Sequence, residues 1–325
     1  MNKKWLGLFL CIVMLVPMWG CANQEGNKVV IYSSAEEYRN EFFQQELDKQ
    51  FPNYDITIEY MTSGNQAAKL LAEGEGSACD ITYDLEYGYV DKLRGVLADL
   101  SSYDMSQYVD DLVDAGKNVL PETRNGGCIA INRKMLEDKG LPIPASYQDL
   151  LKPEYKGLIS MPNPKSSGTG YMFLKSLVNA WGEEEAFEYF KELTPNVLAY
   201  TSSGSGPVNA LVQGEAAIGL AMTAQTVTEI NNGADLEILF FEEGSPYSLY
   251  GTSMIKGKEQ RACVKEVFDY LVNTLVPQDK EKFFPEKIYK DRDFSITNYP
   301  TDIQYADMSN NTAQEKERLL AKWEY

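Results

Sequence analysis

The chain has 325 residues, of which 30 are basic and 48 acidic, so that its formal net charge is −18, and it contains no histidine. An acidic balance of this size argues against a nucleic-acid partner and against broad electrostatic contact with an anionic membrane. The absence of histidine excludes His-based triads and Cys/His zinc sites, and no G-x-S-x-G elbow or G-x-x-x-x-G-K-[ST] phosphate loop is present, so we expect no enzyme activity, metal or cofactor.

Residues 1–20 predict an export signal. Two lysines precede a short apolar run, and Cys21 follows it directly. This pattern is typical of a lipoprotein signal, in which the cysteine after the cut is acylated. A membrane-spanning anchor would need about 20 apolar residues, and this run is shorter and contains Pro17; a simple secreted protein is the other alternative. We expect residues 21–27 to form a lipid-anchored linker that holds the protein on the outer face of the cytoplasmic membrane.

Three cysteines lie in the body of the chain, at positions 79, 128 and 263. An odd number without C-x-x-C spacing allows at most one disulfide, and three buried thiols acting as small apolar side chains is the favoured interpretation.

From residue 28 onward, strand and helix patterns alternate. The expected order is a strand at 29–32, a helix at 35–50, a strand at 54–60, a helix at 66–73 and a short strand at 80–83. This alternation predicts a mainly parallel sheet covered by helices, with ligands at the carboxyl ends of the strands. We assign residues 28–125 to a first lobe.

A second lobe is expected over residues 126–245. It opens with the apolar segment 126–132, and the same alternation then predicts strands at 158–161, 197–200 and 216–222 with helices at 170–180, 186–193 and 207–214. Strands at 236–241 and 252–255 then cross back. Residues 246–325 would carry this crossover and the C-terminal helices, at 260–275 and 313–323.

Three polar turns place hydroxyls and glycines between a strand and a helix: Ser33-Ser34, residues 166–170 and residues 201–206. A helix start leaves about four backbone N–H groups unpaired and carries about half a positive charge, so an anion can bind there without a lysine. The alternative for each single turn is ordinary helix capping. Three such turns on two lobes favour a shared binding cleft.

An aromatic and acidic cluster occupies residues 83–89. Asp84 or Glu86 could hold an ammonium group beneath a tyrosine, although a helix start with half-buried tyrosines explains the same pattern. Tyr247 and Tyr250 would either line the cleft or pack in a hinge.

Four segments carry a family resemblance: VVIYSSAEE from residue 29, the long stretch from Asn132 to SSGTGY, SGSGPVNALVQGEAAIGLAM from residue 203, and EEGSPYSLYGTSMIKG from residue 242. In their order and spacing, residues 28–258 resemble the extracytoplasmic solute-binding proteins of ABC importers, in the group that includes ferric-iron, phosphonate, sugar-phosphate and polyamine binders. The resemblance implies a type II periplasmic-binding-protein fold with two α/β lobes joined by crossover strands. It also implies a monomeric receptor that closes around a small solute and delivers it to a permease and its ATPase.

The resemblance also bears on the ligand. Ferric binders of the group carry an adjacent tyrosine pair where this chain has Thr223-Ala224-Gln225, and losing both phenolates argues against bare iron. The SSGTG turn matches the phosphate-cradling turn of the organophosphate and phosphonate binders. We therefore expect a small phosphorylated or phosphonate solute, held by Ser33, Ser34, Ser63, Ser167, Gly168, Thr169, Ser203, Gly204, Ser205 and Thr223, with Lys165 nearby and with Tyr83, Asp84 and Tyr247 selecting its other end.

Other functions remain open at this point. A polyamine receptor of the same fold would rely on Asp84, Glu86 and the tyrosines, and a ferric-iron receptor is a further alternative. An extracellular hydrolase would need metal-assisted chemistry on carboxylates. Nothing in the sequence favours a purely adhesive lipoprotein.

Overall fold

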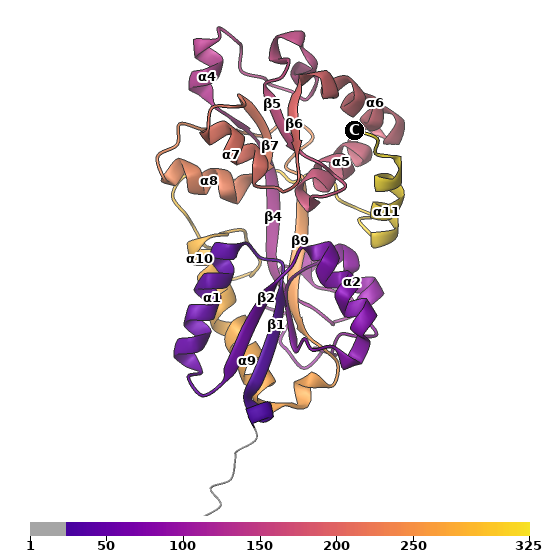
Figure 1. Cartoon of the computed structure of the whole chain (residues 1–325), viewed down its shortest axis with the longest axis vertical. Helices are drawn as coiled ribbons and strands as arrows, with labels where there is room; N and C mark the ends of the chain where they lie inside the picture. Colours follow the sequence, from indigo (N-terminus) through magenta and orange to yellow (C-terminus); the bar gives the residue numbers. More distant parts are fainter. Residues whose placement is uncertain (1–23) are drawn as a thin grey trace, which may run out of the picture.

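A computed structural model describes residues 24–325, and Figure 1 shows two lobes stacked along the long axis of the molecule. The predicted export signal and Cys21, the predicted acylation site, lie outside the described residues. No helix within residues 24–325 has the length and apolar character needed to cross a bilayer.

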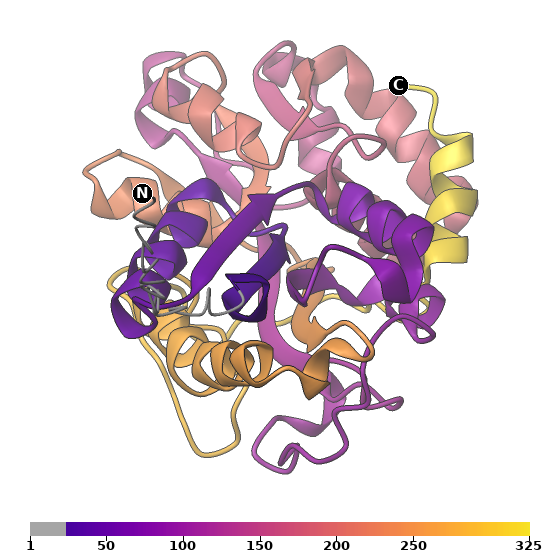
Figure 2. The same ribbon diagram turned by 60° about the horizontal axis from the view of Figure 1, so that its bottom comes forward.

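Lobe 1 is built on three parallel strands. β1 (Lys28–Ser33) lies between β2 (Asp55–Tyr60) and β3 (Ile81–Glu86). Successive side chains of β1 enter different cores because a strand alternates its faces: Val29 packs with α1 (Glu37–Gln50) and α9 (Ala262–Tyr270), whereas Val30 packs with α2 (Ser63–Glu73). Figure 2 shows the two helical layers on opposite sides of these strands. A strand covered on both faces explains the continuous apolar run at 29–32.

Lobe 2 repeats the arrangement. β5 (Ile159–Pro162) lies parallel to and between β6 (Val197–Thr201) and β7 (Ile218–Met222). Its remaining regular elements are β8 (Glu237–Leu239), α4 (Arg133–Asp138), α5 (Gly168–Trp181), α6 (Glu183–Leu193), α7 (Gly206–Val212) and α8 (Thr223–Asn231).

Two long strands connect the lobes. β4 (Leu120–Ile131) and β9 (Tyr247–Met254) pair antiparallel with each other; β9 also pairs with β3 in lobe 1, and β4 with β7 and β8 in lobe 2. The strand order is therefore continuous through both lobes, β2-β1-β3-β9-β4-β7-β5-β6. We call the paired β4 and β9 the crossover ribbon. Its two strands begin earlier than the sequence predicts, at Leu120 rather than 126 and at Tyr247 rather than 252.

The C-terminal part of the chain packs on both lobes. After α9, a π-helical turn (Leu271–Leu275) and α10 (Val276–Lys282) stay with lobe 1, and α11 (Ala313–Lys322) then packs on lobe 2. Leu319 and Trp323 join the core of lobe 2, where the Trp323 ring lies 5.2 Å from that of Phe190. Residues 246–325 thus close the molecule across both lobes.

Shorter segments complete the fold. α3 spans Val90–Leu93, and 3-10 turns occupy Gln24–Asn27, Gly74–Gly76, Tyr87–Tyr89, Asp110–Leu112, Gln148–Leu151, Pro153–Tyr155, Thr194–Asn196 and Lys258–Gln260. The helix start considered for residues 83–89 is wrong for residues 83–86, because β3 continues to Glu86; the half-buried turn Tyr87–Tyr89 does lead into α3. Cys79, Cys128 and Cys263 are buried and free, which confirms the favoured interpretation of three thiols.

Candidate functional site

The lobe 1 side of the candidate site is formed where β1 and β3 end. The Ser34 hydroxyl donates to the carbonyl oxygen of Asp84 at 2.5 Å, lies 3.1 Å from its carboxylate and contacts the Ser63 hydroxyl at 2.9 Å. Asp84 adopts a left-handed conformation with φ of 55°. Left-handed backbone is uncommon outside glycine and is held here by these surrounding bonds. The structure therefore brings together Ser34, Ser63 and Asp84, three of the predicted site residues.

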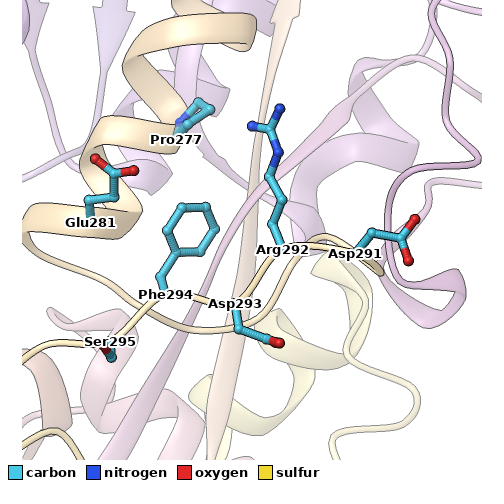
Figure 3. Close-up of a pocket in the computed structure, with 7 residues that line it drawn as sticks. All are labelled: Pro277, Glu281, Asp291, Arg292, Asp293, Phe294 and Ser295. Atoms are coloured by element: carbon cyan, nitrogen blue, oxygen red, sulfur yellow. The ribbon is translucent and has the colours of Figure 1, made fainter.

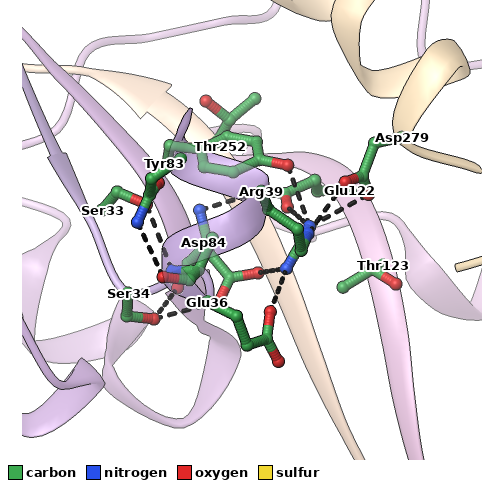
Figure 4. A network of polar contacts seen from close by, with 12 residues as sticks. Ser33, Ser34, Glu36, Arg39, Tyr83, Asp84, Glu122, Thr123, Thr252 and Asp279 are labelled. Atoms are coloured by element: carbon green, nitrogen blue, oxygen red, sulfur yellow. Dashed lines mark hydrogen bonds and ion pairs between the residues drawn. The ribbon is translucent and has the colours of Figure 1, made fainter. Parts of the chain in front are cut away.

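Arg39 supports this group from inside lobe 1. It lies on α1, is 1 % exposed, and its guanidinium donates to four carboxylates: Glu36, Asp84, Glu122 and Asp279. Figure 4 shows them converging on Arg39: Glu36 lies just before α1, Asp84 on β3, Glu122 on the crossover ribbon and Asp279 on α10. The backbone N–H of Asp84 donates to Glu122 at 2.8 Å. Arg39 and Glu122 together fix both the backbone and the side chain of Asp84.

This cluster holds more negative than positive charge. Burial raises the pKa of the Glu122 carboxyl well above its ordinary value, and Asp84 raises it further, while Arg39 opposes both effects. Burial likewise raises the pKa of Glu36, whose side chain is 34 % exposed. The lobe 1 side of the candidate site is therefore acidic and rich in hydrogen-bond acceptors.

The lobe 2 side is formed by the first turn of α5. Ser167 caps the helix, with its hydroxyl accepting from the N–H of Gly170 at 3.5 Å. The N–H groups of Gly168 and Thr169 have no partner within the helix, because the first four N–H groups of any α-helix point out of it. The polar turn at 166–170 therefore presents backbone donors at the positive end of a 14-residue helix.

A second turn of lobe 2 meets the first. A side chain on Gly204 would collide with the Thr169 hydroxyl and come within 3.0 Å of Met222 Sδ, so the backbone at 204 passes close to the start of α5. Ser203 and Ser205 flank it and share a 2.8 Å hydroxyl contact. Thr223 follows Met222 at the start of α8 and is fully buried. Two of the three predicted polar turns thus converge.

Tyr250 links the two sides. It lies on β9 opposite Glu86, and a side chain on Gly168 would stand 3.8 Å from its hydroxyl oxygen. Burial raises the pKa of Tyr250 well above its ordinary value, and the carboxylates of Glu86, Asp84 and Glu36 raise it further. Tyr250 therefore has the acids of lobe 1 around it and the start of α5 in front of it.

Three predicted residues lie away from this group. The Ser33 hydroxyl is buried and bonds to Asn40 and to the Ala35 N–H. Tyr83 is 1 % exposed, and its hydroxyl accepts from Arg39 at 2.9 Å. Tyr247 points to the opposite face of β9 from Tyr250, since residues three apart on a strand face opposite ways.

The network also contains residues that the sequence reasoning did not select. Arg39, Glu122 and Asp279 belong to elements far apart in the chain, and Arg39 and Asp279 are 240 positions apart. No local motif marks them. Glu36 and Tyr250 carry a usable signal. Glu36 lies two residues after the Ser33-Ser34 turn, and Tyr250 belongs to the aromatic pair that the sequence offers as cleft or hinge residues.

A separate cavity of about 570 Å³ lies between α10 and the segment 291–295. Figure 3 shows its lining, which consists of Pro277, Glu281, Asp291, Arg292, Asp293, Phe294 and Ser295. None of the predicted site residues takes part in it.

Comparison with known proteins identifies a family. The model described as bacterial extracellular solute-binding protein matches residues 85–311, which is more than half of the chain. The matched range includes the crossover ribbon and both converging turns of lobe 2.

Individual relatives agree with this match. An uncharacterized protein of Haemophilus influenzae is 28% identical, the alignment covering 94% of this chain and 91% of the relative. The spermidine/putrescine-binding periplasmic protein of Salmonella typhimurium is 23% identical, with 88% and 83% covered. Among solved structures, the periplasmic binding protein AfuA from Actinobacillus pleuropneumoniae, with fructose 6-phosphate bound, superposes with a TM-score of 0.79 at 26% identity, covering 91% of this chain and 97% of AfuA.

Proposed function

The chain belongs to the family of bacterial extracellular solute-binding proteins, and from that premise we propose that it captures a small phosphorylated solute between its lobes for an ABC importer. The family match and the fold make it a binding protein rather than an enzyme, and they imply an extracytoplasmic location. The proposal concerns the identity of the solute and the residues that hold it.

The observation that carries the proposal is the convergence of two polar turns at the start of α5. The phosphoryl oxygens would accept hydrogen bonds from the free backbone N–H groups of Gly168 and Thr169 and from the Thr169 hydroxyl. The turn at 203–205 would supply further donors. No lysine or arginine is required, since a helix N-terminus favours an anion by itself. The likeness to AfuA, which carries fructose 6-phosphate, supports the same class of solute.

One observation favours a second candidate, a polyamine. Four carboxylates face Arg39, and Asp84 and Glu36 lie on the site side of that cluster. An ammonium group would be attracted there, and the Salmonella relative is named for spermidine and putrescine. Ferric iron finds less support, because Thr223-Ala224-Gln225 supplies no phenolate.

Isothermal titration calorimetry of the purified protein tests these candidates against one another. We expect binding of fructose 6-phosphate or glycerol 3-phosphate, and we expect Thr169→Ala and Ser205→Ala to weaken it by about 10- to 100-fold, the effect of losing a hydrogen bond to a charged group. Gly95→Ala is the matched control, because a methyl group there meets nothing within 4 Å. Binding of spermidine or ferric citrate alone would contradict the proposal.

We also propose that an acyl chain on Cys21 anchors the receptor to the outer face of the membrane, next to its permease and ATPase. Labelling of cells with radioactive palmitate should mark the wild-type protein and not Cys21→Ser, because the thiol is the acceptor in lipoproteins. Equal labelling of both forms would exclude this anchor.

A further inference from the structure

The crossover ribbon presents one of its faces to the candidate site. Thr123 pairs with Tyr250 and Asn125 with Ser248. Directly opposed residues of an antiparallel pair share a face, and residues two apart on a strand share it as well. Since the Tyr250 hydroxyl reaches toward Gly168, all four side chains lie on the side of the ribbon that faces the start of α5.

The other face of the ribbon is already filled. Arg124 lies 4.9 Å from the ring centre of Tyr247 and 4.4 Å from that of Tyr305, and it bonds to Asp111 at 2.9 Å. The C-terminal passage that carries Tyr305 therefore covers this face. Only the face with Asn125 and Ser248 is turned toward the candidate site.

Two buried polar atoms on that face have no hydrogen-bond partner. They are Asn125 Oδ1 and Ser248 Oγ. Ser248 is 1 % exposed, and its hydroxyl lies close enough to Tyr250 to lower the pKa of that phenol slightly without forming a well-aligned hydrogen bond with it. Although the two residues are directly opposed, they do not bond to each other. Buried polar groups in folded proteins nearly always have a partner, so an adjacent pair without one indicates a place where a ligand supplies it.

The polar groups around the site are unevenly distributed. The start of α5 offers backbone donors, whereas the lobe 1 side offers the acceptors Asp84 and Glu36, and the N–H groups of Arg39 are directed at carboxylates and at the Tyr83 hydroxyl. Asn125 Oδ1 adds an acceptor on the ribbon. A solute that matches this arrangement carries its anionic group at one end and hydrogen-bond donors at the other.

We propose that Asn125 and Ser248 form a second subsite that binds the end of the solute remote from the phosphoryl group, and that this end carries hydroxyl or ammonium donors. The proposal rests on the proposed function. It narrows the solute to phosphate esters or phosphonates that bear donors a few bonds from the phosphorus.

Three probes of similar size test it by calorimetry: glycerol 3-phosphate, 3-aminopropyl phosphate and n-propyl phosphate, which lacks donors on its chain. We expect n-propyl phosphate to bind at least 10-fold more weakly than one of the other two. Asn125→Ala and Ser248→Ala should weaken that preferred probe by about 10-fold or more and leave n-propyl phosphate unchanged. Preference for 3-aminopropyl phosphate would assign the donor as ammonium, and loss of that preference in Asp84→Asn would place the ammonium beside Asp84. Preference for glycerol 3-phosphate would assign the donor as hydroxyl.

Asn273→Ala serves as the control, because this asparagine is exposed in the π-helical turn after α9 and belongs to neither side of the candidate site. Circular dichroism shows whether Asn125→Ala folds. If it does not, Ser248→Ala alone provides the test, because removing one oxygen from a small side chain disturbs the packing least. Equal binding of all three probes, unaffected by either variant, would overturn the subsite while leaving the proposed function intact. If neither these probes nor inorganic phosphate bind, the proposed function fails and the subsite with it.

Discussion

The guanidinium of Arg39 carries one positive charge and is surrounded by four carboxyl groups. Its four carboxylate partners come from the residue before α1, from β3, from the crossover ribbon and from α10, and two of them, Glu122 and Asp279, are fully buried. A buried charge is tolerated when it is paired and hydrogen-bonded. Arg39 therefore stabilises lobe 1 and at the same time orients Asp84 toward the site.

Lys280 adds a second buried cation beside this cluster. It is 0 % exposed and its Nζ has no hydrogen-bond partner. Burial lowers the pKa of its ammonium group to about 8, although Asp279 opposes the shift. The charged form is thus disfavoured in the folded protein.

This shift predicts a pH dependence. Between about pH 8 and the ordinary lysine value near 10.5, the unfolded chain holds a proton that the folded protein has lost, so the stability of the wild type should rise with pH. Relative to Lys280→Met, the free energy of unfolding should increase by up to about 1.4 kcal/mol per pH unit in that window. Urea unfolding of both proteins at several pH values measures the difference. A constant difference across the window would show that Lys280 does not titrate there.

At the scale of elements, α5 has two functions. Its first turn faces the candidate site, and Tyr171, immediately after that turn, lies beneath Lys316 of α11 with 4.8 Å between the ammonium and the ring centre. The helix therefore connects the solute-binding turn with the C-terminal helix. Its position must be fixed accurately for both contacts to form.

Gly170 fixes that position. A methyl group there would collide with the Pro162 carbonyl oxygen and lie 2.7 Å from the Pro164 nitrogen and 2.8 Å from the Asn163 carbonyl carbon. These are backbone atoms, which cannot move aside as a side chain can. We expect Gly170→Ala to reduce the free energy of unfolding by about 2 kcal/mol or more.

Gly168→Ala is the matched comparison in the same turn, because the nearest atom to its methyl group would be the Tyr250 hydroxyl at 3.8 Å. Its stability should stay within about 0.5 kcal/mol of the wild type. Thermal unfolding of the two variants separates a packing effect at Gly170 from a general effect of removing glycine. Equal stability of both would show that the turn between β5 and α5 adjusts freely.

At the scale of the whole molecule, an ion pair joins the lobes outside the crossover ribbon. Lys316 of α11, which packs on lobe 2, bonds to both oxygens of Glu86 in lobe 1, at 3.1 and 2.9 Å. Burial by itself would lower the pKa of the lysine, but Glu86 and Tyr89 together outweigh burial, and the pKa is raised. The pair is nearly inaccessible to water, with Lys316 9 % exposed and Glu86 1 %.

Removing one partner of this pair should be costly. We expect Lys316→Met to lower the free energy of unfolding by about 3 to 5 kcal/mol, because it leaves a buried carboxylate unpaired. The double variant Glu86→Gln/Lys316→Met should recover most of that loss, since both charges are then absent. Guanidinium unfolding of the four proteins in this cycle measures the coupling. Additive losses would mean that the two side chains do not act as a pair.

Apolar strands and amphipathic helices each leave a characteristic spacing of apolar residues in the sequence. The sequence therefore predicts the two α/β lobes, the order of their elements and the polar turns after their strands. The turn at 166–170 illustrates this, because Ser167 and two glycines at a strand-to-helix junction specify a helix start from neighbouring residues alone. The family resemblance likewise depends on short segments in a fixed order.

Only the tertiary structure decides which of these side chains meet. Tyr83 and Asp84 are adjacent in sequence and both contact Arg39, yet Tyr83 is buried in the core of lobe 1 whereas Asp84 also reaches Ser34. The left-handed backbone of Asp84, at an irregularity in the pairing of β3 with β9, directs its side chain, and no local pattern predicts it. The acids around Arg39, the unpaired atoms of Asn125 and Ser248, and the packing of α11 on lobe 2 depend on strand register and on how the chain returns between the lobes. These contacts join residues far apart in the sequence, where no local pattern can encode them.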